Sequence, residues 1–162
     1  MPATYEAIAT QTLGSATASV TFSSIPSTYT DLVLVVNTGS GTAEDIALRF
    51  NSDTGTNYSR TYFYGNGTVT YSDKNSNVAF SYFGGQNSTT TPVTHIANIM
   101  NYSNSTTFKS MLVKIGSASS VTSLTAHLWR STSTITTIGL FTVSGNNLNA
   151  GSTFTLYGIK AA

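Results

Sequence analysis

The tripeptide Asp53-Thr54-Gly55 is the clearest feature of the sequence that could do chemistry, because aspartic proteases carry their catalytic aspartate in the same three residues. Acid proteolysis requires two carboxylates that share one proton, so that one acts as base and the other as acid. This chain supplies one such tripeptide, and the flanking residues of the segment RFNSDTGTNY (49–58) are mostly polar turn formers. We therefore interpret Asp53 as part of a polar loop between two strands and predict that the protein is not an enzyme.

Two other sets of residues are of the types that bind metal ions in proteins. Asn51, Asp53 and Asn57 could offer oxygens to calcium, but hard cations prefer about six to eight oxygens with several carboxylates, and only Asp53 is acidic. His95 and His127 lie in strand-like segments without an acidic cluster, which makes a weak metal site and no evident catalytic triad. We predict neither metal nor cofactor: the loop side chains would hydrogen-bond their own loop, and the histidines would pair with backbone or hydroxyl groups. Calcium in the loop stays the open alternative.

Aromatic residues are concentrated between positions 58 and 83, where tyrosines alternate with polar residues. Tyrosine combines an apolar ring with a polar tip, so such a segment can form a protein interface or a platform on which sugars stack. The same residues could equally be ordinary core and sheet-surface residues. The candidates for contact with a partner or a glycan are Tyr58, Tyr62, Tyr64, Asn66 and Tyr71.

The composition is that of a folded chain with few charges. Its 162 residues predict one domain, 1–162, large enough to bury its own core. Hydrophobic residues make up 40% and charged residues only 8%, against about 25% charged in ordinary globular domains. A polar but uncharged surface suits a protein that packs against copies of itself or a larger particle. The alternative is simply a threonine-rich all-β domain, because threonine favours pleated surfaces.

Several classes of partner are not expected. The net charge of +1 comes from scattered residues without a basic patch, so we predict no binding to nucleic acid. There is no cysteine, no secretory signal pattern at the start and no apolar run of the roughly 18 residues that a membrane span needs. We expect a soluble protein that is made in a cytoplasm and does not bind membranes.

The elements that would hold these residues in place are strands. Convincing helical periodicity is not found, and alternating apolar and polar residues recur at intervals of roughly 8–12 residues, as in sandwiches and barrels. We predict an all-β, antiparallel β-sandwich, jelly-roll-like, with about ten strands, although periodicity cannot give the strand order. The expected strands are 20–22, 31–36, 46–50, 58–64, 77–83, 93–102, 108–115, 121–130, 135–143 and 154–159.

Three segments carry a resemblance to a known group. They are FSSIPSTY at 22–29, RFNSDTGTNY at 49–58 and FTLYGI at 154–159. In this order they resemble a shared pattern of tailed-bacteriophage structural proteins and phage fibre C-terminal modules: F-x-x-I-P-x-x-Y, then R-F-N-x-D-x-G-x-N-Y, then F-x-L-Y-G-I. The stretch from 66 to 149 matches little. The resemblance implies a virion protein whose central motif is structural, and it supplies no catalytic residue.

Phage fibres usually carry a stalk or attachment segment before such a module, whereas here the module is essentially the whole sequence. We therefore expect a capsid decoration (cement) protein: a homotrimer, located in the virion, that binds the major capsid protein or other virion proteins and stabilises the assembled head. The alternative is a tail-tip or fibre adhesin that binds host surface glycans, with Tyr62, Tyr64, Asn66 and Tyr71 as its contacts.

Overall fold

The computed structural model describes residues 4–38, 45–86, 91–117 and 121–160. Within these ranges every regular element is a β-strand, and there are twelve. They are β1 (Tyr5–Thr12), β2 (Ser19–Phe22), β3 (Asp31–Thr38), β4 (Asp45–Phe50), β5 (Tyr58–Gly65), β6 (Thr70–Val78), β7 (Ser81–Gln86), β8 (Val93–Met100), β9 (Lys109–Gly116), β10 (Thr122–Trp129), β11 (Ile138–Thr142) and β12 (Thr153–Ile159).

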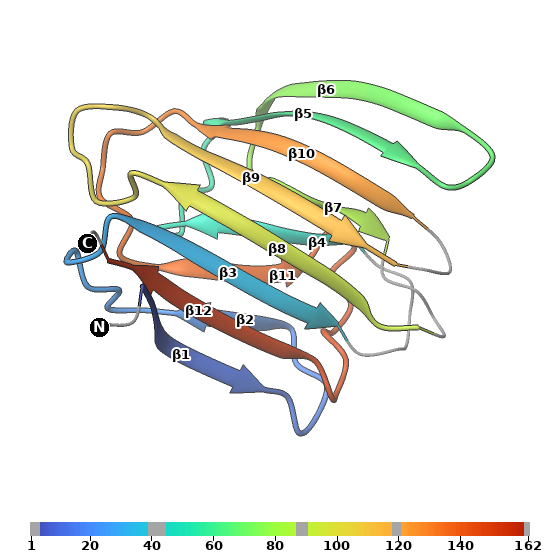
Figure 1. Ribbon diagram of the computed structural model, residues 1–162, viewed down its shortest axis with the longest axis horizontal. Helices are drawn as coiled ribbons and strands as arrows, with labels where there is room; N and C mark the ends of the chain where they lie inside the picture. The colour runs from blue at the N-terminus through green and yellow to red at the C-terminus, as the bar shows by residue number, and fades with distance from the viewer. Residues whose placement is uncertain (1–3, 39–44, 87–90, 118–120, 161–162) are drawn as a thin grey trace.

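The strands form two antiparallel sheets that lie in two layers (Figure 1). The large sheet has eight strands in the order β1-β12-β3-β8-β9-β10-β5-β6, and the small sheet has four in the order β2-β11-β4-β7. Figure 1 looks onto the large sheet, with the small sheet behind it. The predicted all-β antiparallel sandwich is confirmed, while a jelly-roll connection of the strands stays a prediction.

The core lies between the two sheets and follows from strict alternation along the strands. In β8, for example, Val93, His95, Ala97 and Ile99 are buried, and the residues between them are at least partly exposed. Strand registers continue this alternation across the large sheet, so that Leu34 pairs with Ala97 and Ala97 with Val113. Burying one such aliphatic side chain contributes roughly 1.5–3 kcal/mol, and the buried residues of both sheets form one cluster.

Eight strands are wider than four, so the small sheet covers only part of the inner face of the large sheet. Its edge strand β7 lies against β5, β9 and β10. The inner face of β6, beyond β7, carries polar and aromatic residues instead of core residues. The opposite face of the large sheet, which we call the outer face, has no other element over it in the described part of the chain (Figure 1).

Two strands escaped the sequence prediction, and one predicted strand was wrong. β6 has the polar sequence TYSDKNSNV, and none of the residues of β1 is fully buried, because each strand lies at an edge of the large sheet. The predicted strand 77–83 is divided in two: β6 ends at Val78 and β7 begins at Ser81. Asn77 takes a positive φ of 57° near the end of β6, where the register with β5 shifts between the pairs Tyr58–Val78 and Arg60–Asn75.

The segment before β3, which contains Tyr29, contacts both the first strand, β1, and the last strand, β12. The ring of Tyr29 lies against Gly158 so closely that a Cβ at position 158 would come within 2.3 Å of Tyr29 Cγ. The Tyr29 hydroxyl donates to Glu6 Oε2 at 3.3 Å, and Lys160 Nζ pairs with Glu6 Oε1 at 2.7 Å. The first and last of the segments behind the resemblance, 22–29 and 154–159, are thus in direct contact.

Candidate functional site

The Asp53 loop is a closed hydrogen-bonding unit. Asp53 Oδ1 accepts the Gly55 backbone N–H at 2.8 Å, and Oδ2 accepts both Asn57 Nδ2 at 2.9 Å and the Trp129 indole Nε1 at 2.7 Å. Partial burial acts to raise the pKa of Asp53, but the hydrogen bonds from Trp129, Asn57 and Gly55 outweigh it and hold the pKa below its usual value. The ionised carboxylate therefore serves as a structural acceptor, as expected for a loop.

Asn51 ties the same loop to the chain before β11. It takes a positive φ of 51°, and its Oδ1 accepts the backbone N–H groups of Thr136 at 2.9 Å and Thr137 at 3.1 Å. Its Nδ2 donates to Thr134 O at 2.8 Å. Asn51 Oδ1 and both carboxylate oxygens of Asp53, which were considered for calcium, therefore accept from N–H groups. In the described ranges, no group of three or more histidine, aspartate or glutamate residues has the arrangement of a metal site.

The two histidines lie on the inner face of the large sheet but do not meet. His95 on β8 pairs with Ile115 of β9, and Ile115 pairs with Ser123 of β10. His127 lies four residues further along β10, so the two histidines are at different levels of the sheet. His127 Nδ1 lies 2.6 Å from Ser81 Oγ, as predicted for a hydroxyl partner. The prediction is wrong for His95, because neither of its ring nitrogens has a hydrogen-bond partner among the described residues.

Burial sets the charge state of both rings. Desolvation lowers the pKa of His95 to about 4. Desolvation, together with the nearby positive charge of Arg60, lowers the pKa of His127 to about 3. Both imidazoles are therefore neutral at pH 7. Their neighbours Ser123 and Thr125 also carry buried hydroxyls without a partner among the described residues, so this part of the interior is polar but weakly paired.

Three of the five candidate contact residues do come together. Tyr62 and Tyr64 of β5 have parallel rings with centroids 6.5 Å apart, and Tyr71 of β6 lies 6.2 Å from Tyr62 and 5.7 Å from Tyr64. Cross-strand registers place all three on the inner face, because Tyr64 pairs with both Tyr71 and the buried Ser123. They stand beyond β7, and Tyr71 is 48% exposed.

The other two candidate residues have different positions. Tyr58 is only 1% exposed; its ring stacks on Trp129, and its hydroxyl accepts the Phe50 backbone N–H at 3.0 Å. The prediction that Tyr58 makes surface contacts is therefore wrong, because at this end of β5 the small sheet covers the inner face. Asn66 lies in the turn between β5 and β6, where its Oδ1 accepts the backbone N–H groups of Thr68 and Val69 at 3.0 and 2.9 Å.

Sequence reasoning missed the residues that extend the tyrosine cluster. The Arg60 guanidinium carbon lies 4.4 Å from the ring centroid of Tyr62 and 4.0 Å from that of Tyr82, and Arg60 Nε donates to Asn75 Oδ1 at 2.8 Å. The period-two spacing of Arg60 and Tyr62 could have placed them on one face of β5. The contribution of Tyr82 depends on the packing of β7 against β5, which no local pattern reveals.

From Tyr82 the contacts continue onto the outward side of the small sheet. Tyr82 lies 4.8 Å from Phe80, and Phe80 lies 5.8 Å from Phe141 of β11. The Arg49 guanidinium carbon is 4.5 Å from the Phe141 ring centroid. We call the whole series the aromatic strip; its members are Phe141, Arg49, Phe80, Tyr82, Arg60, Tyr62, Tyr64 and Tyr71.

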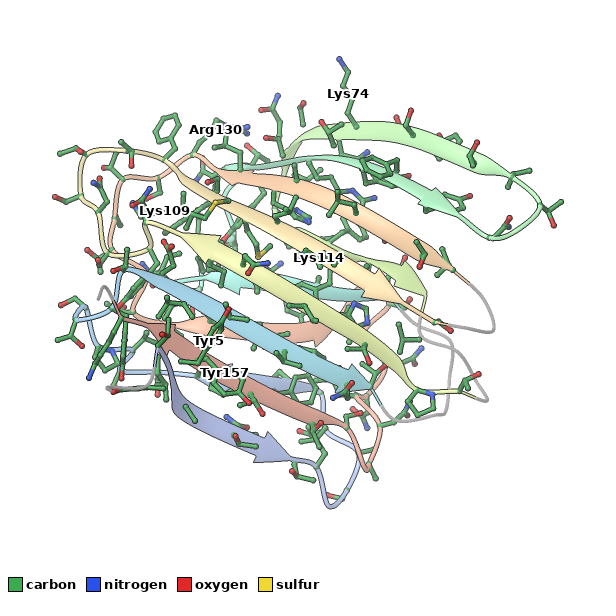
Figure 2. All side chains as sticks on the ribbon, viewed as in Figure 1. Tyr5, Lys74, Lys109, Lys114, Arg130 and Tyr157 are labelled. Carbon is green, nitrogen blue, oxygen red and sulfur yellow. The ribbon has the colours of Figure 1, made fainter. Side chains whose placement is uncertain are left out.

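The outer face is the second notable surface. Registers place Val35, Ile96, Lys114, Leu124 and Phe63 side by side across five neighbouring strands. Phe63 is 56% exposed and Ile96 37% exposed. Towards the other edge of the sheet, Tyr5 and Tyr157 meet edge to face on β1 and β12 (Figure 2). This face is therefore apolar over much of its width and interrupted by few charges.

A hollow of about 650 Å³ lies at the end of the large sheet near the β5–β6 turn. This volume falls within the range of small-molecule sites. The residues that line it come from β5, β6, β9 and β10 and include Phe63, Tyr64, Tyr71, Lys114 and Leu124. The hollow thus adjoins both the tyrosine cluster and the apolar row of the outer face.

Comparison of the chain with protein-family models, with curated proteins and with solved structures found no match. Among the described residues there is no helix with the length and hydropathy to cross a lipid bilayer.

Proposed function

We propose that this chain is a non-enzymatic structural protein of a phage virion, a capsid decoration (cement) protein that stabilises the assembled head. The observation that carries the proposal is the outer face of the large sheet. Antiparallel sheets commonly have one solvated face, and that face is then polar. Here it presents Val35, Ile96, Leu124 and Phe63 in one row across the sheet, with Lys114 between Ile96 and Leu124 as the charged member of the row.

A broad apolar sheet face is a reason to look for a protein partner. Contiguous exposed apolar patches are uncommon on soluble monomers, and larger ones mark interaction surfaces. The scarcity of charge favours the same conclusion, because the centre of a protein interface is depleted in charged residues. Lys74, which projects from the edge strand β6 in Figure 2, would suit a carboxylate at the rim of a partner, and Lys114, between Ile96 and Leu124, would suit one nearer the centre of the contact.

The mechanism we propose is binding to the assembled state alone. A protein that contacts neighbouring capsid subunits only when they are in place stabilises the shell by mass action, as any ligand stabilises the state that it binds. The added interface would then resist the pressure of the packaged DNA. The resemblance to virion proteins supports the further proposal that the chain acts as a homotrimer at local threefold positions of the head lattice.

The test is co-sedimentation of purified protein with phage heads from the source culture. The variant Phe63→Thr combined with Ile96→Thr removes two exposed apolar side chains of the outer face and should weaken head binding at least tenfold. Val69→Thr is the matched control, because Val69 is 51% exposed but lies in the β5–β6 turn. Equal binding of both variants and the unchanged protein would exclude the outer face as the contact.

A second candidate function is a tail-tip or fibre adhesin. The observation that favours it is the grouping of Tyr62, Tyr64 and Tyr71 on an exposed part of the inner face. A shallow set of rings with polar tips suits weak binding of sugars. The location of the protein on the virion separates the two candidates, because an adhesin belongs at the tail.

A further inference from the structure

We propose that the aromatic strip is an extended binding site for a linear, uncharged oligosaccharide of several hexopyranose units. The inference rests on the geometry of the strip and holds whether the protein lies on the head or at the tail. It goes beyond the tyrosine cluster of the adhesin hypothesis, because it assigns ligand contacts to Arg60 and to the outward side of the small sheet.

The strip is one continuous series of contacts across both sheets. Starting from the tyrosine cluster, Arg60 lies between Tyr62 and Tyr82, at 4.4 and 4.0 Å from their ring centroids. Tyr82 leads to Phe80 at 4.8 Å, and Phe80 to Phe141 at 5.8 Å. Because β7 is an edge strand, its Tyr82 is the place where the strip passes from one sheet to the other.

The two arginines make the strip continuous and rigid. Each guanidinium makes cation–π contacts with two rings, Arg60 with Tyr62 and Tyr82 and Arg49 with Phe141 and Phe80, and each is fixed by a further hydrogen bond. Arg60 Nε donates to Asn75 Oδ1 at 2.8 Å, and Arg49 Nε donates to Ala79 O at 3.1 Å. A surface held in this way loses little conformational entropy when a ligand binds, which favours recognition of a weakly binding partner.

The chemistry of the strip favours an uncharged sugar over a protein segment or an anion. Its contact surface consists of aromatic rings, several of them with hydroxyl tips, which match the apolar C–H faces and the hydroxyls of a pyranose. The positive charge of Arg60 is offset by Asp73, which pairs with Tyr62 in the register of β5 and β6. Asp73, which is exposed, then supplies carboxylate oxygens that hydrogen-bond sugar hydroxyls.

The length of the strip implies more than one sugar unit. The tyrosine cluster lies on the inner face of the large sheet, while Phe80 and Phe141 lie by the small sheet, with Arg60 and Tyr82 between these two groups. A single sugar can cover one group of rings but not both. We therefore expect affinity to increase with the number of units until both groups are covered.

The experiment is binding of uncharged oligosaccharides of one to six units, built from glucose, galactose, mannose or N-acetylglucosamine, measured by ligand-observed NMR and calorimetry. We expect at least one series to bind, with a Kd of roughly millimolar for the short members, about −4 kcal/mol, and tighter for the hexamer. Tyr71→Ala and Tyr62→Ala should weaken binding of every length at least tenfold. Phe80→Ala should weaken the hexamer more than the dimer.

Tyr5→Ala is the matched control, because Tyr5 is 59% exposed and lies on β1, away from the strip. Tyr71 is itself exposed, so its variant tests the proposal even if Tyr62→Ala fails to fold. The proposal would be overturned if none of the four series showed measurable binding, or if Tyr71→Ala and Tyr5→Ala bound with equal affinity. If head binding is lost in Tyr71→Ala but saccharides do not bind, the strip is a protein contact instead. Failure here leaves the Phe63 and Ile96 test of the decoration role unaffected.

Discussion

Replacing Asp53 by alanine should destabilise the fold, because its carboxylate holds its own loop together and joins that loop to Trp129 at the end of β10. The change removes acceptors for Gly55 N, Asn57 Nδ2 and Trp129 Nε1. Trp129 is buried, so its indole N–H would lose its partner without gaining full access to water. A buried donor left unpaired costs about 1–3 kcal/mol, and the two more accessible bonds add less. We expect a loss of roughly 2–4 kcal/mol.

The assay is thermal unfolding followed by circular dichroism. For a chain of this size, 1 kcal/mol corresponds to a shift in Tm of about 2–4 °C, so Asp53→Ala should unfold roughly 5–15 °C earlier. Asp53→Asn should lose less, because an amide oxygen can still accept from Trp129. Thr54→Ala is the control and should change the stability by under about 0.5 kcal/mol. The reasoning is refuted if Asp53→Ala keeps its full Tm while an acid, pepstatin-sensitive proteolysis disappears.

Three further changes test other parts of the structure. Since the folded pKa of His95 is about 4, below the unfolded value near 6.5, its contribution of roughly 3 kcal/mol is present above pH 6.5 and lost as the pH falls to 4. Urea unfolding at several pH values should show this slope, and His95→Phe should reduce the slope without removing it, because His127, with a pKa of about 3, contributes a slope of the same sign. Gly158→Ala should cost about 1–3 kcal/mol through collision with Tyr29, and a Tyr29→Ala background should abolish most of that loss in a double-mutant cycle. Tyr58→Phe should cost about 1–3 kcal/mol in chemical unfolding by leaving the Phe50 N–H unpaired, and an unchanged midpoint would contradict this role.

The sequence predicted the elements that face the core, and it failed at the two edges of the large sheet. Strands such as β8 and β12 alternate between buried and partly or fully exposed residues, and this alternation is a property of the sequence itself. The edge strand β6 escaped notice because most of its residues are exposed, so nothing selects an apolar period. The division of 77–83 places its two parts in different sheets, and the sheet that a strand joins depends on contacts between segments far apart in the sequence.

The candidate site was predictable only in part, because its arrangement also depends on contacts between segments far apart in the sequence. Tyr62 and Tyr64 share a face by their spacing, and that spacing grouped them correctly. It also placed Tyr58 on that face, but only the three-dimensional structure shows that the small sheet covers this end of β5. The neighbourhood of Arg60 and Tyr82 is set by the packing of one sheet on the other, between residues more than twenty positions apart.

The most direct test of the proposed function is immunogold electron microscopy, with antibody to this protein, on phage particles from the source culture. If the protein is a capsid decoration protein, we expect gold distributed over the heads. Gold confined to the tail end would contradict the decoration role and favour the adhesin. The absence of gold from all particles would contradict any role in the virion.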